Sequence, residues 1–146
     1  MAEHPSTTRA FDTVLADRPD VLEHLSAAHQ AALDAVEPRL LELCRRRIGS
    51  LLGSEAEEGS GLDDQTIAAL PQWPSSELFS ETERVCLAFT EQFVIDVATL
   101  DDPTAFAVVE ALGAQGFADF ASALLVVEQR QRLQLIWQQL FTEVPT

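Results

Sequence analysis

The chain contains no lysine, asparagine or tyrosine, and its 146 residues include only two cysteines and one methionine. All nine basic residues are therefore arginine, against 24 aspartate and glutamate residues, and the formal net charge is −15. Nucleic-acid binding requires a basic surface that displaces counterions from phosphates. Recruitment to an anionic membrane surface likewise depends on clustered basic residues. We therefore expect neither nucleic acid nor membrane among the partners of this chain.

Long apolar runs are also missing, as is the pattern of a secretory signal peptide. Residues 1–8 contain no apolar run, and the longest apolar stretch, 121–127, is interrupted by Ser122. The two cysteines, Cys44 and Cys86, lie too far apart in the sequence to form a CxxC pair. Two thiols in an acidic chain without a secretion signal fit a reducing compartment, so we expect cytoplasmic localisation.

Helical signals dominate the sequence, and signals for β-hairpins are missing. There is no Asn-Gly turn and no sustained alternation of apolar and polar residues. The length fits one domain over residues 1–146, with residues 1–6 as a disordered tail. We predict an all-α fold of six or seven helices. The expected helices are 6–16, one capped by Asp17 with Pro19 in its first turn, one from Pro38 to about residue 52, 62–70, one from a Ser80 capping box, one capped by Asp101 that ends near Gly113, and 117–141.

Apolar residues at helical spacing predict which side chains face the interior. This inward-facing set includes Phe11, Leu33, Leu40, Cys44, Ile48, Cys86, Phe89, Val97 and Phe106. Between these helices, residues 53–61 are rich in glycine and glutamate and predict a solvated loop. The segment 71–74 contains two prolines and predicts a turn, because Pro74 disfavours helical geometry at Trp73.

The last helix is apolar around almost its whole circumference from Phe117 to Val127. Such a helix must be covered on every side, because each large apolar side chain left in water forgoes about 1.5–3 kcal/mol. The other short helices cover it only in part. We therefore expect a subunit interface that includes Leu124 and Val127, and a homo-oligomer as the assembled form.

Three segments of the chain are similar to one known family. They are residues 18–43, residues 42–53, and Leu70-Pro-Gln-Trp-Pro74 with Leu78-Phe-Ser-Glu-Thr-Glu-Arg84 and the Leu-Ala-Phe-Thr-Glu run that follows. They resemble the alkylhydroperoxidase D-like (AhpD-like) and carboxymuconolactone decarboxylase superfamily, and the third is similar to its "W…FS..ER…LAF.E" pattern. The resemblance implies an AhpD-like helical domain that assembles as a trimer or hexamer.

The redox members of that family carry a glutamate, then a CxxC pair, then a histidine. The thiol pair reduces peroxide, which requires an acidified first cysteine and a second one close enough to close a disulfide. On this sequence the resemblance places Glu42 at the glutamate, Ser54 and Glu57 at the two cysteines, and Gly61 at the histidine. A serine cannot form the disulfide, so the resemblance implies a protein that lacks thiol peroxidase activity.

Three residues are candidates for acid–base catalysis: Glu42, His29 and Glu57. Glu42 lies opposite the apolar stripe of its helix, where it either faces a neighbouring subunit as a catalytic carboxylate or pairs with Arg46 one turn later. His29 is either a general acid or base, or a partly buried helical histidine. Glu57 is either part of the site or part of the solvated loop.

Three further residues are candidates for ligand binding: Arg47, Ser54 and Trp73. Arg47 could clamp a substrate carboxylate with two hydrogen bonds, or form a structural ion pair. Ser54 lacks the histidine base that would activate it, and Trp73 also fits a role as a core or interface anchor. Because His24 and His29 do not share a helix face, we expect no metal site, and we expect no cofactor.

Two classes of function remain open. The first is a divergent, non-redox AhpD-like protein that binds a small hydrophobic or carboxylated ligand or acts as an accessory protein. The alternative is a cofactor-free enzyme that resembles carboxymuconolactone decarboxylase and uses carboxylate and histidine chemistry on a small acidic lactone. A weaker third hypothesis, based on charge alone, is an interaction module that binds a basic partner through residues 55–64.

Overall fold

The computed structural model describes residues 7–54 and 61–142. Glu57 and the predicted tail, residues 1–6, lie outside this part of the chain. In the described part the only regular elements are helices, which confirms the predicted all-α class. They are α1 (Thr7–Val14), α2 (Pro19–Ala35), α3 (Pro38–Leu52), α4 (Asp64–Ala69), α5 (Glu81–Ile95) and α6 (Asp102–Thr142), with two short 3₁₀ helices, η1 (Leu70–Ser75) and η2 (Val97–Thr99).

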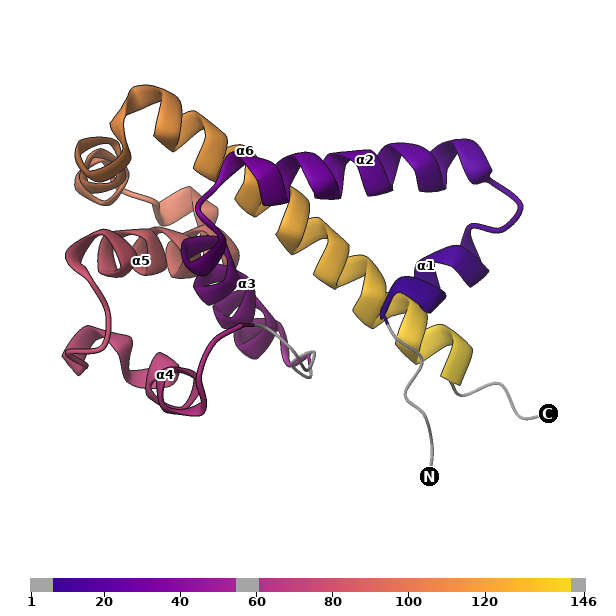
Figure 1. Ribbon diagram of the computed structural model, residues 1–146, viewed down its shortest axis with the longest axis horizontal. Helices are drawn as coiled ribbons and strands as arrows, with labels where there is room; N and C mark the ends of the chain where they lie inside the picture. The colour runs from indigo at the N-terminus through magenta and orange to yellow at the C-terminus, as the bar shows by residue number, and fades with distance from the viewer. Residues whose placement is uncertain (1–6, 55–60, 143–146) are drawn as a thin grey trace.

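The long α6 is the central element, and α1, α2, α3 and α5 all pack against it. It runs diagonally across the molecule, with α5 beside its first half and α1 near its C-terminal end (Figure 1). The α3–α5 contact is the other main interface. Fully buried side chains are concentrated where these helices meet: Leu43, Cys44, Ile48, Cys86, Leu87, Val108, Phe120, Leu124 and Val127.

The start of α2 differs from the prediction in one detail. Pro19 occupies the first turn as expected, but the N-cap residue is Arg18 rather than Asp17, and its side chain makes no capping hydrogen bond. Pro19 has no N–H to satisfy and already carries a helical φ, so the helix can begin there without a polar cap. The Arg18 guanidinium instead binds the Asp20 carboxylate with two hydrogen bonds of 3.1 Å.

The end of α3 is closed by a Schellman motif. Gly53 has a φ of 77°, in the left-handed region that favours glycine. Its N–H donates to the carbonyl of Ser50, and the N–H of Ser54 donates to the carbonyl of Gly49 over 2.8 Å. This pair of bonds satisfies carbonyls that the helix end would leave open. It also turns Ser54 back onto the last turn of α3.

The segment between α4 and α5 follows the sequence signals closely. The predicted turn at residues 71–74 is the 3₁₀ helix η1, in which Gln72 departs from helical geometry. The predicted capping box is confirmed: the Ser80 hydroxyl accepts from the N–H of Glu83, and the Glu83 carboxylate accepts from the N–H of Ser80. Phe79, just before the cap, is buried in the core.

The helix α6 is interrupted at Gly113, as the sequence predicts. Gly113 has φ 79° and ψ 168°, outside helical geometry, although the helix resumes at once on its far side. The Asp101 carboxylate caps the first half by accepting from the N–H of Thr104 at 2.9 Å, which also agrees with the prediction. By length and composition, Asp102–Gln139 would suffice to cross a membrane. Of its most apolar window, 22% is buried inside the structure, and Phe120, Leu124 and Val127 on this helix belong to the core.

Several predictions of burial were wrong. Leu33, Val97 and Phe106 are exposed, Phe106 to 61%. Val97 lies in η2 after α5 has ended, and Phe106 lies on the side of α6 that faces away from the core. Leu124 and Val127 are buried inside a single protomer, so they cannot form the predicted subunit interface. Among the described side chains of α6 after Gly113, the large apolar ones that are exposed are Leu125 and Ile136.

Candidate functional site

The first polar cluster of interest centres on Glu42, on the side of α3 away from the α3–α5 interface. Both carboxylate oxygens of Glu42 accept from Arg45, at 2.8 Å from Nε and 2.7 Å from Nη2. The Nε of Arg46 lies 3.5 Å from the same carboxylate, as the i,i+4 spacing predicts. All three side chains are at most 20% exposed. This fork geometry fixes the position of the Glu42 carboxylate between the two guanidinium groups.

Gln131 on α6 joins this cluster from the opposite side. Its Nε2 donates to the main-chain carbonyl of Arg45 at 2.9 Å, which fixes the orientation of the amide. The Oε1 atom is buried and has no hydrogen-bond partner among the described residues. It points toward Gly49: a Cβ on this glycine would lie 3.3 Å from Oε1 and 2.8 Å from the Oγ of Ser54. Gly49 thus allows Ser54 and Gln131 to approach each other.

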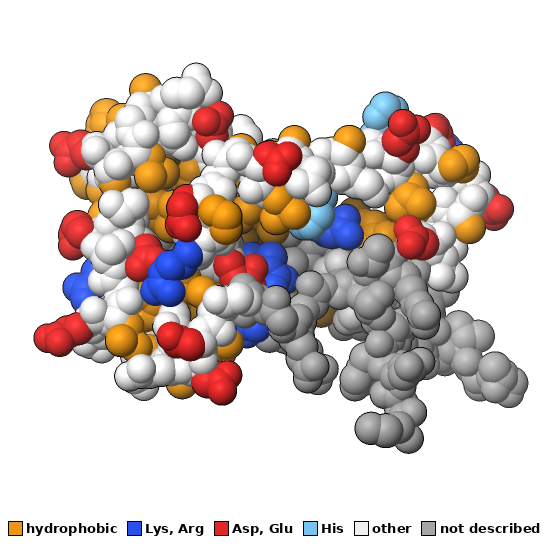
Figure 2. Space-filling model, viewed as in Figure 1, with side chains coloured by type: hydrophobic (Ala, Val, Ile, Leu, Met, Phe, Trp, Pro, Cys, Tyr) orange, Lys and Arg blue, Asp and Glu red, His pale blue; other side chains and the backbone are white. Residues whose placement is uncertain are grey.

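His29 on α2 lies beside the same group of residues. Its ring is half-buried, and its Nδ1 has no hydrogen-bond partner in the described structure. Burial lowers the pKa of His29, and the nearby charges of Arg130 and Arg45 lower it further. The imidazole is therefore neutral at pH 7. Arginine and histidine side chains lie next to each other near the middle of the face shown in Figure 2.

The second polar cluster joins α3, α5 and η1 through Glu91. The Nε of Arg47 donates to Oε1 of Glu91 at 2.8 Å, and the indole Nε1 of Trp73 donates to the same oxygen at 2.7 Å. Arg47 is thus engaged in an internal ion pair, and Trp73 holds η1 against α5. Both side chains are hydrogen-bonded within the protomer, and a ligand-binding role for either stays a prediction.

The two thiols lie in neither cluster. Cys44 on α3 and Cys86 on α5 are both free and fully buried where the two helices pack. Burial raises the pKa of each thiol to about 12, and a hydrogen bond with Thr90 offsets this only in part for Cys44. The Thr90 hydroxyl itself donates to the carbonyl of Cys86 at 2.8 Å. Both cysteines are packed as small apolar side chains.

The structure brings three of the predicted site residues to one region and separates the others. Glu42, His29 and Ser54 surround Arg45 and Gln131 at the meeting point of α2, α3 and α6. Arg47 and Trp73 share Glu91 in a different cluster, and Glu57 lies outside the described residues. No group of three metal-binding side chains occurs in the part of the chain that the structure describes.

Sequence reasoning missed Gln131 and Glu91, which organise the two clusters. Nothing local marks Gln131, because its hydrogen-bond partner, the carbonyl of Arg45, lies 86 residues earlier in the chain. Glu91 belongs to the Leu-Ala-Phe-Thr-Glu run that carries the family resemblance. That run marked the position of Glu91 but did not indicate its two partners.

Comparison with known structures identifies the fold of this chain. No protein-family model matches the sequence, and no curated protein matches it. The structure is similar to a crystal structure from Agrobacterium tumefaciens, of a protein described as having unknown function and as a proposed antioxidant defence protein AhpD. The TM-score is 0.76 at 15% sequence identity, over 91% of this chain and 96% of that chain. The chain therefore has the AhpD-like fold, as its three similar segments indicated. At this identity the likeness establishes the fold and no shared activity.

Proposed function

We propose that this chain is a non-redox protein with the AhpD-like fold, which assembles as a homo-oligomer and binds a small ligand or serves as an accessory protein. The observation that carries the non-redox part is the burial of both thiols. Peroxide reduction requires an accessible thiolate. Burial raises the pKa of both thiols to about 12, far above pH 7, so both stay protonated as well as inaccessible. At the position that the family resemblance gives to the first thiol stands Ser54.

The ligand-binding part of the proposal rests on the cluster between α2, α3 and α6. Arg45 and Arg46 both contact Glu42, and the charges of Arg45 and Arg130 lie near the neutral His29. In a chain of charge −15 this local excess of positive charge would attract a small carboxylate. The buried Oε1 of Gln131 supplies an acceptor for a hydroxyl or N–H group.

The alternative, a cofactor-free enzyme similar to carboxymuconolactone decarboxylase, is favoured by one observation. His29 is neutral and has an unpartnered Nδ1, as an acid–base group requires. Against it, both oxygens of the second candidate acid, Glu42, already accept from Arg45. The binding function therefore accounts for more of the cluster. Loss of an acidic lactone from solution in the presence of the protein, abolished in His29→Gln, would favour the enzyme instead.

The proposal is tested by incubating the protein with an alkyl hydroperoxide and a dithiol reductant. We expect consumption of the hydroperoxide at the rate of the reductant alone. The matched control is the double variant Cys44→Ser, Cys86→Ser, which should give the same rate. Catalytic turnover that disappears in either single serine variant would defeat the non-redox proposal.

A further inference from the structure

Gln131 presents a fixed hydrogen-bond acceptor to the cluster around Glu42. The residue is 7% exposed, and its Nε2 donates to the main-chain carbonyl of Arg45 at 2.9 Å. Rotating the amide by half a turn would set Oε1 against that carbonyl, so the positions of its oxygen and nitrogen are fixed. Oε1 can only accept, and it has no partner among the described residues. A buried acceptor without a donor is unfavourable, so a ligand group that donates to Oε1 is favoured there.

Ser54 and the bare backbone of Gly49 border this acceptor. A Cβ on Gly49 would lie 3.3 Å from Oε1 of Gln131 and 2.8 Å from Oγ of Ser54. Both oxygens therefore lie beside the space that Gly49 leaves open. The Schellman motif holds Ser54 in this place, since its N–H donates to the Gly49 carbonyl. One oxygen atom of a ligand between the two side chains could donate to Oε1 and accept from the Ser54 hydroxyl.

The charges around the cluster distinguish between the donor groups that a ligand could offer. Burial lowers the pKa of His29, and the charges of Arg130 and Arg45 lower it further. The same positive charges disfavour an ammonium group in this region. A neutral amide N–H can donate to Gln131, but its nitrogen cannot also accept from Ser54. A hydroxyl is neutral and can do both, so it is the donor that fits the two side chains best.

We propose that the cluster between α2, α3 and α6 binds a small hydroxy acid, and that Gln131 selects this ligand over the same acid without the hydroxyl. This selectivity rests on the ligand-binding function proposed above, in which positive charge attracts the carboxylate. The ligand hydroxyl donates to Oε1 of Gln131 and accepts from Ser54. An acid without the hydroxyl would leave Oε1 unpaired, and a site that hydrogen-bonds a hydroxyl discriminates strongly against such an analogue.

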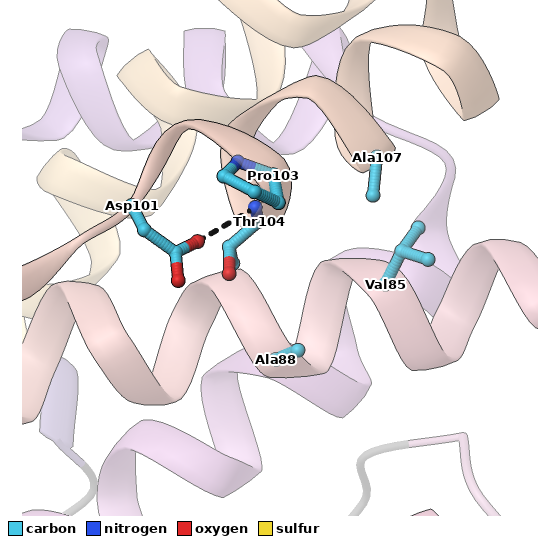
Figure 3. Close-up of a pocket in the computed structure, with 6 residues that line it drawn as sticks. All are labelled: Val85, Ala88, Asp101, Pro103, Thr104 and Ala107. Carbon is cyan, nitrogen blue, oxygen red and sulfur yellow. Dashed lines mark hydrogen bonds between the residues drawn. The ribbon is translucent and has the colours of Figure 1, made fainter.

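The hollow between α5 and the first turns of α6 lacks a comparable feature (Figure 3). It has a volume of about 280 Å³ and is lined by Val85, Ala88, Asp101, Pro103, Thr104 and Ala107. Its carboxylate is already engaged, because Asp101 accepts from the Thr104 N–H at 2.9 Å. None of the six lining residues has a buried side-chain polar atom without a partner in the described structure. Gln131 therefore indicates the chemistry of a ligand, whereas this hollow does not.

The test compares three pairs of acids that differ by one hydroxyl: glycolate with acetate, lactate with propionate, and 3-hydroxybutyrate with butyrate. Titrations followed by NMR give the dissociation constant of each acid. We expect at least one hydroxy acid to bind more tightly than its partner acid, by about tenfold or more. If no acid of any pair binds, small carboxylates are not the ligands, and the ligand-binding function fails together with the selectivity. Equal affinities within every pair would overturn the hydroxyl selectivity alone and would indicate that water satisfies Oε1.

Two matched variants then test the role of Gln131. Gln131→Met keeps the length of the side chain but removes the acceptor, so the affinities within the preferred pair should become equal. A purely structural effect would weaken both acids alike and leave their ratio unchanged. Gln129→Met makes the same change at an exposed position of the same helix and should keep the preference. An unchanged preference in Gln131→Met would overturn the role of Gln131.

A second measurement on the unmodified protein tests the contact even if Gln131→Met fails to fold. The side-chain NH₂ signals of Gln131, assigned by triple-resonance NMR, should shift on addition of the preferred hydroxy acid and much less on addition of its partner acid. Equal shifts with both acids would show that the hydroxyl does not reach this amide and would contradict the proposed contact.

Discussion

Arg45 donates hydrogen bonds from both Nε and Nη2 to the Glu42 carboxylate, at 2.8 and 2.7 Å, within one turn of α3. Two residues further along, Arg47 points away from this pair and binds Glu91 on α5 instead. Consecutive helical residues are about 100° apart, so Arg46 still reaches the Glu42 carboxylate at 3.5 Å, whereas Arg47 lies about 200° around the helix from Arg45 and meets a different helix. The Arg45-Arg46-Arg47 run therefore contributes to two separate clusters. The cluster around Glu42 includes the buried atoms His29 Nδ1 and Gln131 Oε1, which have no hydrogen-bond partner in the described structure. The cluster around Glu91, which we call the tether, links α3 and η1 to α5.

The tether predicts a loss of stability when Glu91 is neutralised. Glu91→Gln keeps the size of the side chain but removes the charge shared by Arg47 and Trp73. We expect the free energy of unfolding to fall by about 1–3 kcal/mol, the usual range for a partly buried charged hydrogen bond. The measurement is the urea midpoint. Glu110→Gln, at an exposed position of α6, should change it by less than about 0.5 kcal/mol, and equal losses in both would refute the tether.

The burial of His29 predicts a dependence of stability on pH. The folded pKa of His29 lies below its ordinary value of 6.5, mainly because the ring is buried and further because Arg130 and Arg45 are near. Below pH 6.5 the unfolded chain therefore binds this proton more readily than the folded one. The free energy of unfolding should be unaffected by His29 above that pH and should fall as the pH drops through the lowered pKa.

This contribution is isolated by comparing variants between about pH 5 and pH 8, the range in which histidine titrates. Stability should fall less steeply toward acid in His29→Gln than in the unmodified protein. The control is His24→Gln, which removes a histidine from an exposed position of the same helix. Parallel curves for all three proteins would show that His29 titrates normally in the folded state.

How much the sequence predicted depended on whether a signal was local. The Ser80 capping box and the break at Gly113 depend on neighbouring residues and were read correctly. The family-like segments predicted the fold, which the comparison confirms. The predicted burial of Phe106 was wrong, because periodicity identifies the apolar face of a helix but does not show whether another helix covers that face. Gln131 was missed because its partners are set by the α3–α6 packing.

The position of Leu124 and Val127 changes the test for a homo-oligomer. An arginine at either position would be buried in the protomer core and would unfold it rather than dissociate subunits. Leu125 and Ile136 are 45% and 49% exposed and lie on one face of α6, three turns apart. If subunits meet there, Leu125→Arg should lower the mass measured by light scattering without changing the circular dichroism spectrum. A 16.0 kDa monomer for the unmodified protein at micromolar concentration would contradict the oligomer.

The central claim is that this chain carries out no thiol redox chemistry, and it is tested most directly by the reactivity of the two cysteines in the native state. The protein is treated with an alkyl hydroperoxide, then with a thiol-specific alkylating reagent, and its mass is recorded before and after unfolding. We predict that Cys44 and Cys86 remain unoxidised, and that both are alkylated only once the protein is unfolded. Rapid native alkylation, or oxidation of either cysteine by the hydroperoxide within minutes, would contradict the account.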